Sequence, residues 1–108
     1  MTEHIINKLF ETIESRKEAE ASTSYVASLF EKGTDKIAEK LSEETTETII
    51  EAVKGNKEKL AEESADLLFH LMVLWSDAGL KPDDIFQILE KREGISGHDE
   101  KASRAPHN

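Results

Sequence analysis

Two long amphipathic stretches, residues 34–54 and 57–78, make up much of the chain and meet at Gly55-Asn56. Apolar side chains recur at helical spacing in both stretches, and a glycine between them is typical of a helix end. If the chain doubles back at Gly55, the two helices lie antiparallel and side by side. The sequence therefore predicts an all-α fold centred on a long antiparallel helix pair.

Shorter helices are expected on both sides of this pair. Residues 4–14 carry one apolar face, and residues 25–32 form a second short helix that ends at Gly33. Pro82 pre-sets the first turn of a fifth helix, which runs to about residue 93. Two prolines and five glycines in the whole chain leave little room for a turn-rich β fold. We therefore expect a helical bundle of about five helices.

The expected helix starts rest on residues with short polar side chains. Charged and small side chains in residues 15–24 indicate a connection between the first two helices. Ser22 or Ser24 is expected to cap the second helix, because a serine oxygen can accept from a free backbone N–H at a helix start. A Thr34-Asp35 cap is expected to begin the third helix.

The length and charge of the chain limit its class. At 108 residues it is the size of one domain, which we place at residues 1–93, followed by a tail at residues 94–108 that has little to bury. Fourteen Lys and Arg against 23 Asp and Glu give a net charge of -9, which argues against a nucleic-acid surface. A phosphorylated ligand can still bind such a protein if divalent cations lie between the two.

Other features of the chain point to a soluble, cytoplasmic protein. No cysteine is present, so neither disulfides nor thiolate metal sites can form. The N-terminus carries acidic residues and no long apolar run, so we expect neither a signal peptide nor an anchor. No stretch approaches the roughly 20 apolar residues that span a bilayer. We therefore expect no membrane contact.

Residues 67–78, LLFHLMVLWSDA, are apolar nearly all round the helix. Such a helix is buried on several sides, and a single chain of this size has few elements with which to bury it. A second subunit explains the pattern best, so we expect a homodimer to complete the bundle.

Acidic residues interrupt the apolar seams of both long helices. In the first long helix, Glu44 fills the slot between Leu41 and Thr48, and in the second, Glu63 fills the slot between Leu60 and Leu67. The seams consist of the following residues: Ile37, Leu41, Thr48 and Val53 in the first, and Leu60, Leu67, Leu71 and Leu74 in the second. Charged residues are rarely buried unless they are paired or coordinated.

A chain reversal at Gly55 would bring four carboxylates together. Glu44 would lie level with Asp66, and Glu47 level with Glu63. Such a group is tolerable with cations, shared protons or full solvation. Magnesium prefers oxygen ligands and leaves positions for phosphates, and two such ions can hold both the attacking and the leaving oxygen of a displacement at phosphorus. The group therefore suits the cleavage of a phosphoanhydride bond.

A solvated acidic face is the competing interpretation. With 23 acidic residues, acidic pairs at i, i+3 spacing arise often by chance, so spacing alone decides little. The symmetry about Gly55 and the position of Glu44 and Glu63 within apolar seams favour a metal site. For Glu51 and Glu58 we prefer the solvated face.

Several neighbouring residues have two interpretations. Lys36 and Lys40 precede Glu44 on the same helix face, where they either contact phosphates or make ion pairs along the helix, and spacing alone favours ion pairs. His70, a single histidine in an apolar helix, is typical of a hydrogen-bonded core residue rather than of a site residue. Tyr25 and Trp75 are expected to pack, although either can line a pocket for a base.

The acidic pattern resembles a known signature. Glu43-Glu44-x-x-Glu47 followed by Glu63-x-x-Asp66 is similar to the motif of the all-α, MazG-like nucleotide pyrophosphatase superfamily. The segments SYVASLFEKGTDKIAEKLSEETTE, ESADLLFHLMVLW and LEKREGISGHDEKASR narrow the resemblance to the phosphoribosyl-ATP pyrophosphatase family of histidine biosynthesis. The likeness runs from about Leu9 to Arg104 without a large insertion.

This resemblance implies a homodimeric helical bundle that uses Mg²⁺ to hydrolyse phosphoribosyl-ATP to phosphoribosyl-AMP and pyrophosphate. It implies that water attacks the α-phosphorus, and that Glu43 or Glu47 acts in catalysis. Four residues match the metal-binding positions of the family: Glu44, Glu47, Glu63 and Asp66. Five basic residues match positions that contact substrate: Lys36, Lys40, Arg92, Lys101 and Arg104.

The chain departs from the family pattern at Ser42, Phe69 and His98, where glycine, tyrosine and an apolar residue are common. Phe69 loses a hydroxyl donor near the site. The chain has neither the room nor the cysteines for the cyclohydrolase to which this family is sometimes fused, so we expect a stand-alone pyrophosphatase. Two alternatives stay open: a related pyrophosphatase for another nucleoside triphosphate, and a non-catalytic dimerisation module that uses the apolar face around Leu71 and Trp75.

Overall fold

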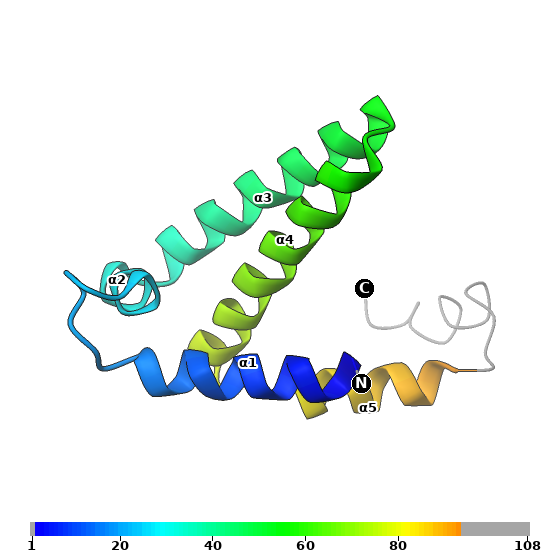
Figure 1. Cartoon of the computed structure of the whole chain (residues 1–108). Coiled ribbons are helices and arrows are strands. Elements are labelled where there is room, and N and C mark those ends of the chain that lie inside the picture. The colour runs from blue at the N-terminus through cyan, green and yellow to red at the C-terminus, as the bar shows by residue number, and fades with distance from the viewer. Residues whose placement is uncertain (1, 94–108) are drawn as a thin grey trace, which may run out of the picture.

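A computed structural model describes the backbone of residues 2–93 and the side chains of residues 5–93. Within this part of the chain every regular element is a helix, as the sequence predicts (Figure 1). The five helices are α1 (Thr2–Arg16), α2 (Tyr25–Lys32), α3 (Thr34–Lys54), α4 (Lys57–Ala78) and α5 (Pro82–Arg92). None of the described helices is both long and apolar enough to span a bilayer. The predicted tail, residues 94–108, lies outside the described residues.

The ends of the helices follow local backbone chemistry. Ser24 caps α2, because its hydroxyl oxygen accepts from the backbone N–H of Ala27 at 3.1 Å. The prediction of a Thr34-Asp35 cap for α3 is wrong: Gly33 occupies the cap position and offers no side chain. The hydroxyl of Thr34 instead donates to the Asp77 carboxylate at 2.6 Å, which ties the start of α3 to the end of α4.

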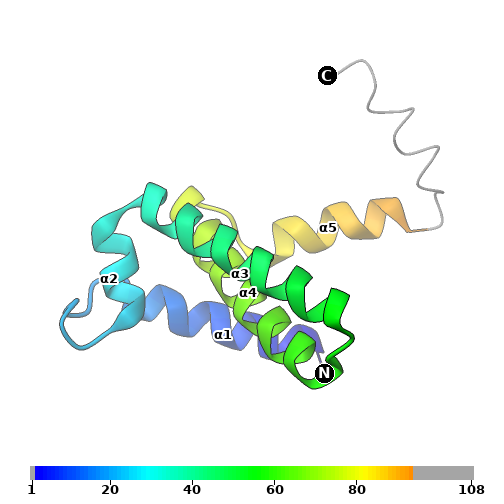
Figure 2. The same ribbon diagram turned by 90° about the horizontal axis from the view of Figure 1, so that it is seen from above.

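The turn at Gly55 reverses the chain between α3 and α4. Gly55 adopts a left-handed conformation with φ of 75°, which costs a glycine little. Asn56 then caps α4 by accepting from the backbone N–H of Lys59 at 3.1 Å. The predicted antiparallel helix pair is confirmed: α3 and α4 lie side by side in both views (Figures 1 and 2) and share the most extensive contact of any two helices described.

The apolar core lies at one end of this pair. There α1 and the C-terminal half of α4 pack against each other, and α2 covers the start of α3 (Figure 1). Seven buried apolar residues form the core: Phe10, Ile13, Val26, Leu29, Ile37, Met72 and Val73. Half-buried aromatic side chains, Phe30, Phe69 and Trp75 among them, surround it. The packing role predicted for Trp75 is confirmed.

Burial falls along α3 from the core toward the turn at Gly55. Ile37 is fully buried and Leu41 is half-buried, whereas Val53 is 82% exposed. The prediction that Val53 belongs to the inner seam is therefore wrong, because Val53 lies near the turn at Gly55, away from the core that α1 and α2 help to form. The carboxylates lie between these extremes, near the edge of the core.

Candidate metal and nucleotide site

Three of the four predicted carboxylates come together between α3 and α4. Glu44 of α3 and Glu63 and Asp66 of α4 each offer one oxygen, and these three oxygens lie within 4.8 Å of one another. Glu44 continues the buried face of α3, and Glu63 and Asp66 lie one turn apart on α4. Because the helices are antiparallel about Gly55, the two faces meet at this level.

The fourth predicted carboxylate, Glu47, lies beside this group. The approach of its carboxyl to that of Glu63, with burial adding to it, raises the pKa of Glu63 to about 7. Two carboxyls this close repel each other when both are ionised, and they can hydrogen-bond only when one of them holds a proton. The predicted level pairing of Glu47 with Glu63 is thus present, whereas Glu47 does not supply one of the three closest oxygens.

Two of these carboxylates keep a buried oxygen without a partner. Glu44 Oε2 and Glu63 Oε2 are inaccessible to solvent and accept no hydrogen bond from the described protein. Burial, and then the negative charge of Glu47, raise the pKa of Glu44. A buried acceptor without a donor is costly, and a cation would satisfy both oxygens. Hard divalent cations bind oxygens at about 2.0 to 2.6 Å, so oxygens this close can share one ion.

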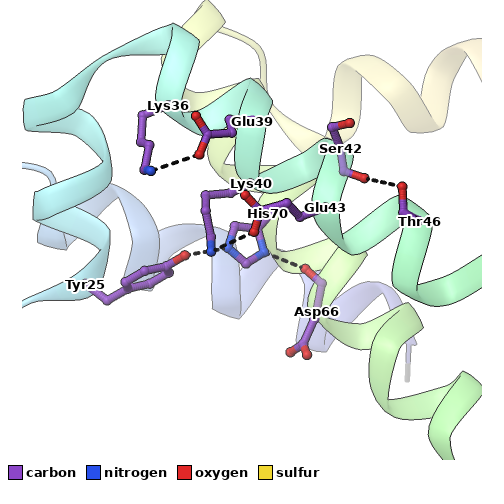
Figure 3. Close-up of polar contacts among 9 residues, drawn as sticks. All are labelled: Tyr25, Lys36, Glu39, Lys40, Ser42, Glu43, Thr46, Asp66 and His70. Carbon is purple, nitrogen blue, oxygen red and sulfur yellow. Dashed lines mark hydrogen bonds and ion pairs between the residues drawn. The ribbon is translucent and has the colours of Figure 1, made fainter.

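The first acid of the motif, Glu43, lies outside this group. Its side chain is exposed and accepts from Lys40 Nζ at 3.3 Å, an i, i+3 ion pair that raises the pKa of Lys40 (Figure 3). Lys36 pairs in the same way with Glu39 at 3.0 Å. Ion pairs along the helix, which spacing favoured for both lysines, are therefore present. Both ammonium groups remain partly open to solvent, and such exposed pairs are weak enough to exchange partners.

The basic residues expected near the C-terminus are not gathered at the site by the described structure. Arg92 is the last residue of α5, which follows the opposite end of α4 from Gly55 (Figures 1 and 2). Lys101 and Arg104 lie outside the described residues. Their contact with substrate stays a prediction.

Sequence reasoning missed the burial of Glu51. Its side chain is only 17% exposed and Oε1 is a third buried oxygen that accepts no hydrogen bond, so the predicted solvated face is wrong there. Glu51 follows Glu44 by seven residues and Thr48 by three, so the periodicity of the seam could have placed it inside. Glu58 is exposed, as predicted.

A second polar feature, Tyr25 with His70, adjoins the carboxylates. His70 is buried, and its ring nitrogens lie 2.8 Å from the Asp66 carbonyl oxygen and 2.8 Å from the Tyr25 hydroxyl (Figure 3). The prediction of a hydrogen-bonded core histidine is confirmed. Tyr25 is half-exposed rather than packed inside. Its contact with His70 joins residues 45 positions apart in the sequence, so no local sequence pattern predicts it.

The fold and the site define the class of protein: a helical hairpin protein with a carboxylate cluster suited to divalent cations. The profile of the phosphoribosyl-ATP pyrophosphohydrolase family matches residues 6–93. The chain is 54% identical over 100 residues to a phosphoribosyl-ATP pyrophosphatase of Azospirillum brasilense, covering 93% of this chain and 90% of that protein. It is 49% identical over 106 residues to one from Chromobacterium violaceum, covering 98% of each. The chain belongs to the phosphoribosyl-ATP pyrophosphohydrolase family.

Proposed function

We propose that this chain hydrolyses the bond between the α- and β-phosphates of phosphoribosyl-ATP, releasing phosphoribosyl-AMP and pyrophosphate, the second step of histidine biosynthesis. The observation that carries the proposal is the cluster of Glu44, Glu63 and Asp66 within the region that the family profile matches. The names of the similar proteins support the same substrate.

The residues present fit a divalent cation, which we take to be Mg²⁺. Glu44, Glu63 and Asp66 would hold it, and the oxygens of Glu44 and Glu63 that accept no hydrogen bond would gain a partner. When bound, Mg²⁺ offsets the charge of the triphosphate and lowers the pKa of a bound water. Glu47 lies next to the cluster and would complete the ligand set.

Among the protein groups, we assign proton transfer to Glu47. Its carboxyl lies against that of Glu63, and once a cation has displaced any proton held between the two carboxyls, the Glu47 carboxylate is free to take a proton from the attacking water. Glu43, the other catalytic candidate, is exposed and paired with Lys40. We therefore assign Glu43 to orienting Lys40.

Lys36 and Lys40 are assigned to the phosphates. Both lie on the side of α3 that leads to the carboxylates, and each is held in place by a single acid one turn away. An incoming phosphate can replace these surface acids because exposed ion pairs contribute about 1 kcal/mol or less. Substrate contact by Arg92, Lys101 and Arg104 is proposed from the family resemblance alone.

Release of pyrophosphate from phosphoribosyl-ATP, with Mg²⁺ and with a chelator, tests the function. Glu47→Gln and Glu63→Gln should each lower turnover at least about 100-fold, while circular dichroism shows an unchanged helix content. Glu58→Gln is the matched control, because Glu58 is an exposed acid at the start of α4. Full turnover by either site variant, or in the presence of chelator, would contradict the assignment.

Each of the two alternative functions predicts a different experimental result. If the enzyme acts on another nucleoside triphosphate, a substrate panel will show higher kcat/KM for that compound than for phosphoribosyl-ATP. If the chain is a non-catalytic dimerisation module, the carboxylates will bind no cation. Calorimetric titration with Mg²⁺ separates the second alternative from both enzymatic ones.

We also propose a homodimer in which the hairpin of one copy packs on another. Ile49, Ile50 and Val53 on α3 and Leu68 on α4 are all exposed in the isolated chain, and exposed apolar side chains on a hairpin beyond the core favour self-association. Light scattering should give the mass of two chains. Ile49→Lys should then shift the protein toward one chain, whereas Lys8→Gln, on α1, should not.

A further inference from the structure

His70 is a buried imidazole that the hydrolytic mechanism does not use. It lies on α4 one turn after Asp66, with a relative exposure of 6%. Nδ1 lies 2.8 Å from the Asp66 carbonyl oxygen, and Nε2 lies 2.8 Å from the Tyr25 hydroxyl. Both ring nitrogens therefore have hydrogen-bond partners, and one of these partners, Tyr25, belongs to α2.

The carbonyl partner fixes the direction of the first hydrogen bond, and the direction of the second follows for a neutral imidazole. A carbonyl oxygen can only accept, so Nδ1 carries the proton. In a neutral imidazole Nε2 then has a lone pair and no proton, so it accepts from Tyr25. With His70 neutral, the phenolic proton of Tyr25 is used toward His70. Toward any other group, the Tyr25 hydroxyl oxygen then acts as a hydrogen-bond acceptor.

The ring of Tyr25 is held in place but left open. It stacks beside Phe69 with ring centroids 6.5 Å apart and an angle of 23° between the planes, while Phe69 meets His70 edge to face at 5.2 Å. Tyr25 is nevertheless 50% exposed. A ring fixed on one side and open on the other suits contact with a ligand.

Tyr25 also faces the groups that we assign to the substrate. Burial raises the pKa of its phenol, the positive charges of Lys40 and Lys36 oppose that rise, and the carboxylates of Glu44 and Glu43 add to it. The hydroxyl therefore lies within electrostatic reach of both lysines and of one proposed metal ligand. Figure 3 shows it pointing toward this end of the site from α2.

We propose that Tyr25 is a specificity-determining residue that accepts a hydrogen bond from a ribose hydroxyl of the bound nucleotide, with His70 as the residue that positions it. The proposal rests on the proposed function. A phosphate oxygen that carries no proton is an acceptor and does not match a hydroxyl whose proton is already donated. The sugar next to the triphosphate supplies donors. Tyr25 therefore selects for the sugar while Lys36 and Lys40 bind the phosphates.

A purely structural role for the pair makes a different prediction. A structural bond between α2 and α4 would affect the free energy of unfolding and would act equally on all substrates. A contact with the ribose acts only on substrates that carry the hydroxyl. The two roles are therefore separated by comparing substrates within one variant, which cancels any loss of folded protein.

The experiment is a double-mutant cycle that pairs the Tyr25 hydroxyl of the enzyme with the ribose hydroxyls of the substrate. The wild type and Tyr25→Phe are each assayed with phosphoribosyl-ATP and with analogues that lack the 2′- or the 3′-hydroxyl of the adenosine half. With one of the two analogues, kcat/KM of the wild type should fall about 3- to 10-fold relative to phosphoribosyl-ATP, the value of a single hydrogen bond. With the same analogue, kcat/KM of Tyr25→Phe should fall less than about 2-fold. Thr12→Val removes a hydroxyl that bonds only within α1, and it should discriminate like the wild type. Equal discrimination by the wild type and Tyr25→Phe with both analogues would overturn the proposal.

His70→Gln and His70→Leu test the positioning. The glutamine oxygen can take the place of Nε2 as acceptor, so His70→Gln should retain most of the discrimination against the deoxy analogue. Leucine offers no acceptor, so His70→Leu should lose it. Retention of full discrimination by His70→Leu would show that His70 does not position Tyr25.

A measurement without turnover separates this proposal from the proposed function. The ¹⁵N shifts of the imidazoles at pH 8, assigned by comparison with His70→Gln, should show His70 protonated on Nδ1. Protonation on Nε2 would overturn the proposal whatever the enzyme hydrolyses. If another triphosphate proves to be the substrate, the cycle is run with that compound and its deoxy forms, and the same outcomes apply.

Discussion

The carboxyl of Glu47 on α3 lies against that of Glu63 on α4 across the helix pair. This contact raises the pKa of Glu63 from 4.5 to about 7. We therefore expect a bound cation to displace a proton from this pair of carboxyls. Several measurable properties depend on this exchange.

Without cations, stability should fall as the pH rises through about 7. The folded protein binds the Glu63 proton more tightly than the unfolded chain, whose glutamates titrate near 4.5. The stabilising contribution is therefore fully present below about pH 4.5 and is lost as the pH passes about 7. Thermal unfolding in chelator from pH 5.5 to 8.5 measures it. In Glu63→Gln this part of the pH dependence should disappear, and an unchanged slope would contradict the raised pKa of Glu63.

Added Mg²⁺ should stabilise the protein, and more so at high pH. A cation competes with the proton on Glu63, so its affinity should fall about tenfold for each pH unit below 7 if one proton is displaced. At 100 times its dissociation constant, a ligand adds about 2.7 kcal/mol to the stability. Melting at pH 8.5 and at pH 6 over a series of Mg²⁺ concentrations tests this, with Glu58→Gln as control. An equal response at both pH values would contradict the competition.

Removing the charge of Lys40 should weaken substrate binding more than it lowers turnover. A hydrogen bond to a charged group contributes about 1.5 to 3 kcal/mol, so Lys40→Gln should raise KM about tenfold or more. Loss of the exposed pair with Glu43, by itself, should change stability by less than about 1 kcal/mol. Steady-state kinetics measures KM and kcat, with Lys8→Gln as the control that removes the same charge elsewhere. An unchanged KM would remove Lys40 from the phosphate site.

Core truncation should be severe at Ile37 and mild at Val53 for the isolated chain. Ile37 is fully buried, and cutting a buried isoleucine to alanine costs about 2 to 5 kcal/mol. Val53 is 82% exposed, so Val53→Ala should change stability by less than about 0.5 kcal/mol. Urea unfolding at low protein concentration gives both values. A larger loss for Val53→Ala that grows with concentration would place Val53 in a dimer interface.

The sequence predicted the helix pair closely because its signals are local. Glycine at the reversal and apolar spacing within each helix act over a few residues, and α3 and α4 span the predicted residues 34–54 and 57–78. The same reasoning failed for Val53 and Glu51. The extent of packing along α3 depends on the positions of α1 and α2, and no local sequence pattern predicts those positions.

The sequence by itself determined the helices and the antiparallel level of the carboxylates, because helical periodicity and a reversal at Gly55 fix which residues face each other. Only the tertiary structure decided how those groups interact. It set the carboxyl of Glu47 against that of Glu63, paired Glu43 with Lys40, and set Tyr25 against His70 across 45 residues. Such contacts depend on side-chain rotamers and on helix packing at distances of a few ångströms, and residues far apart in the chain acquire them only when the fold brings them together.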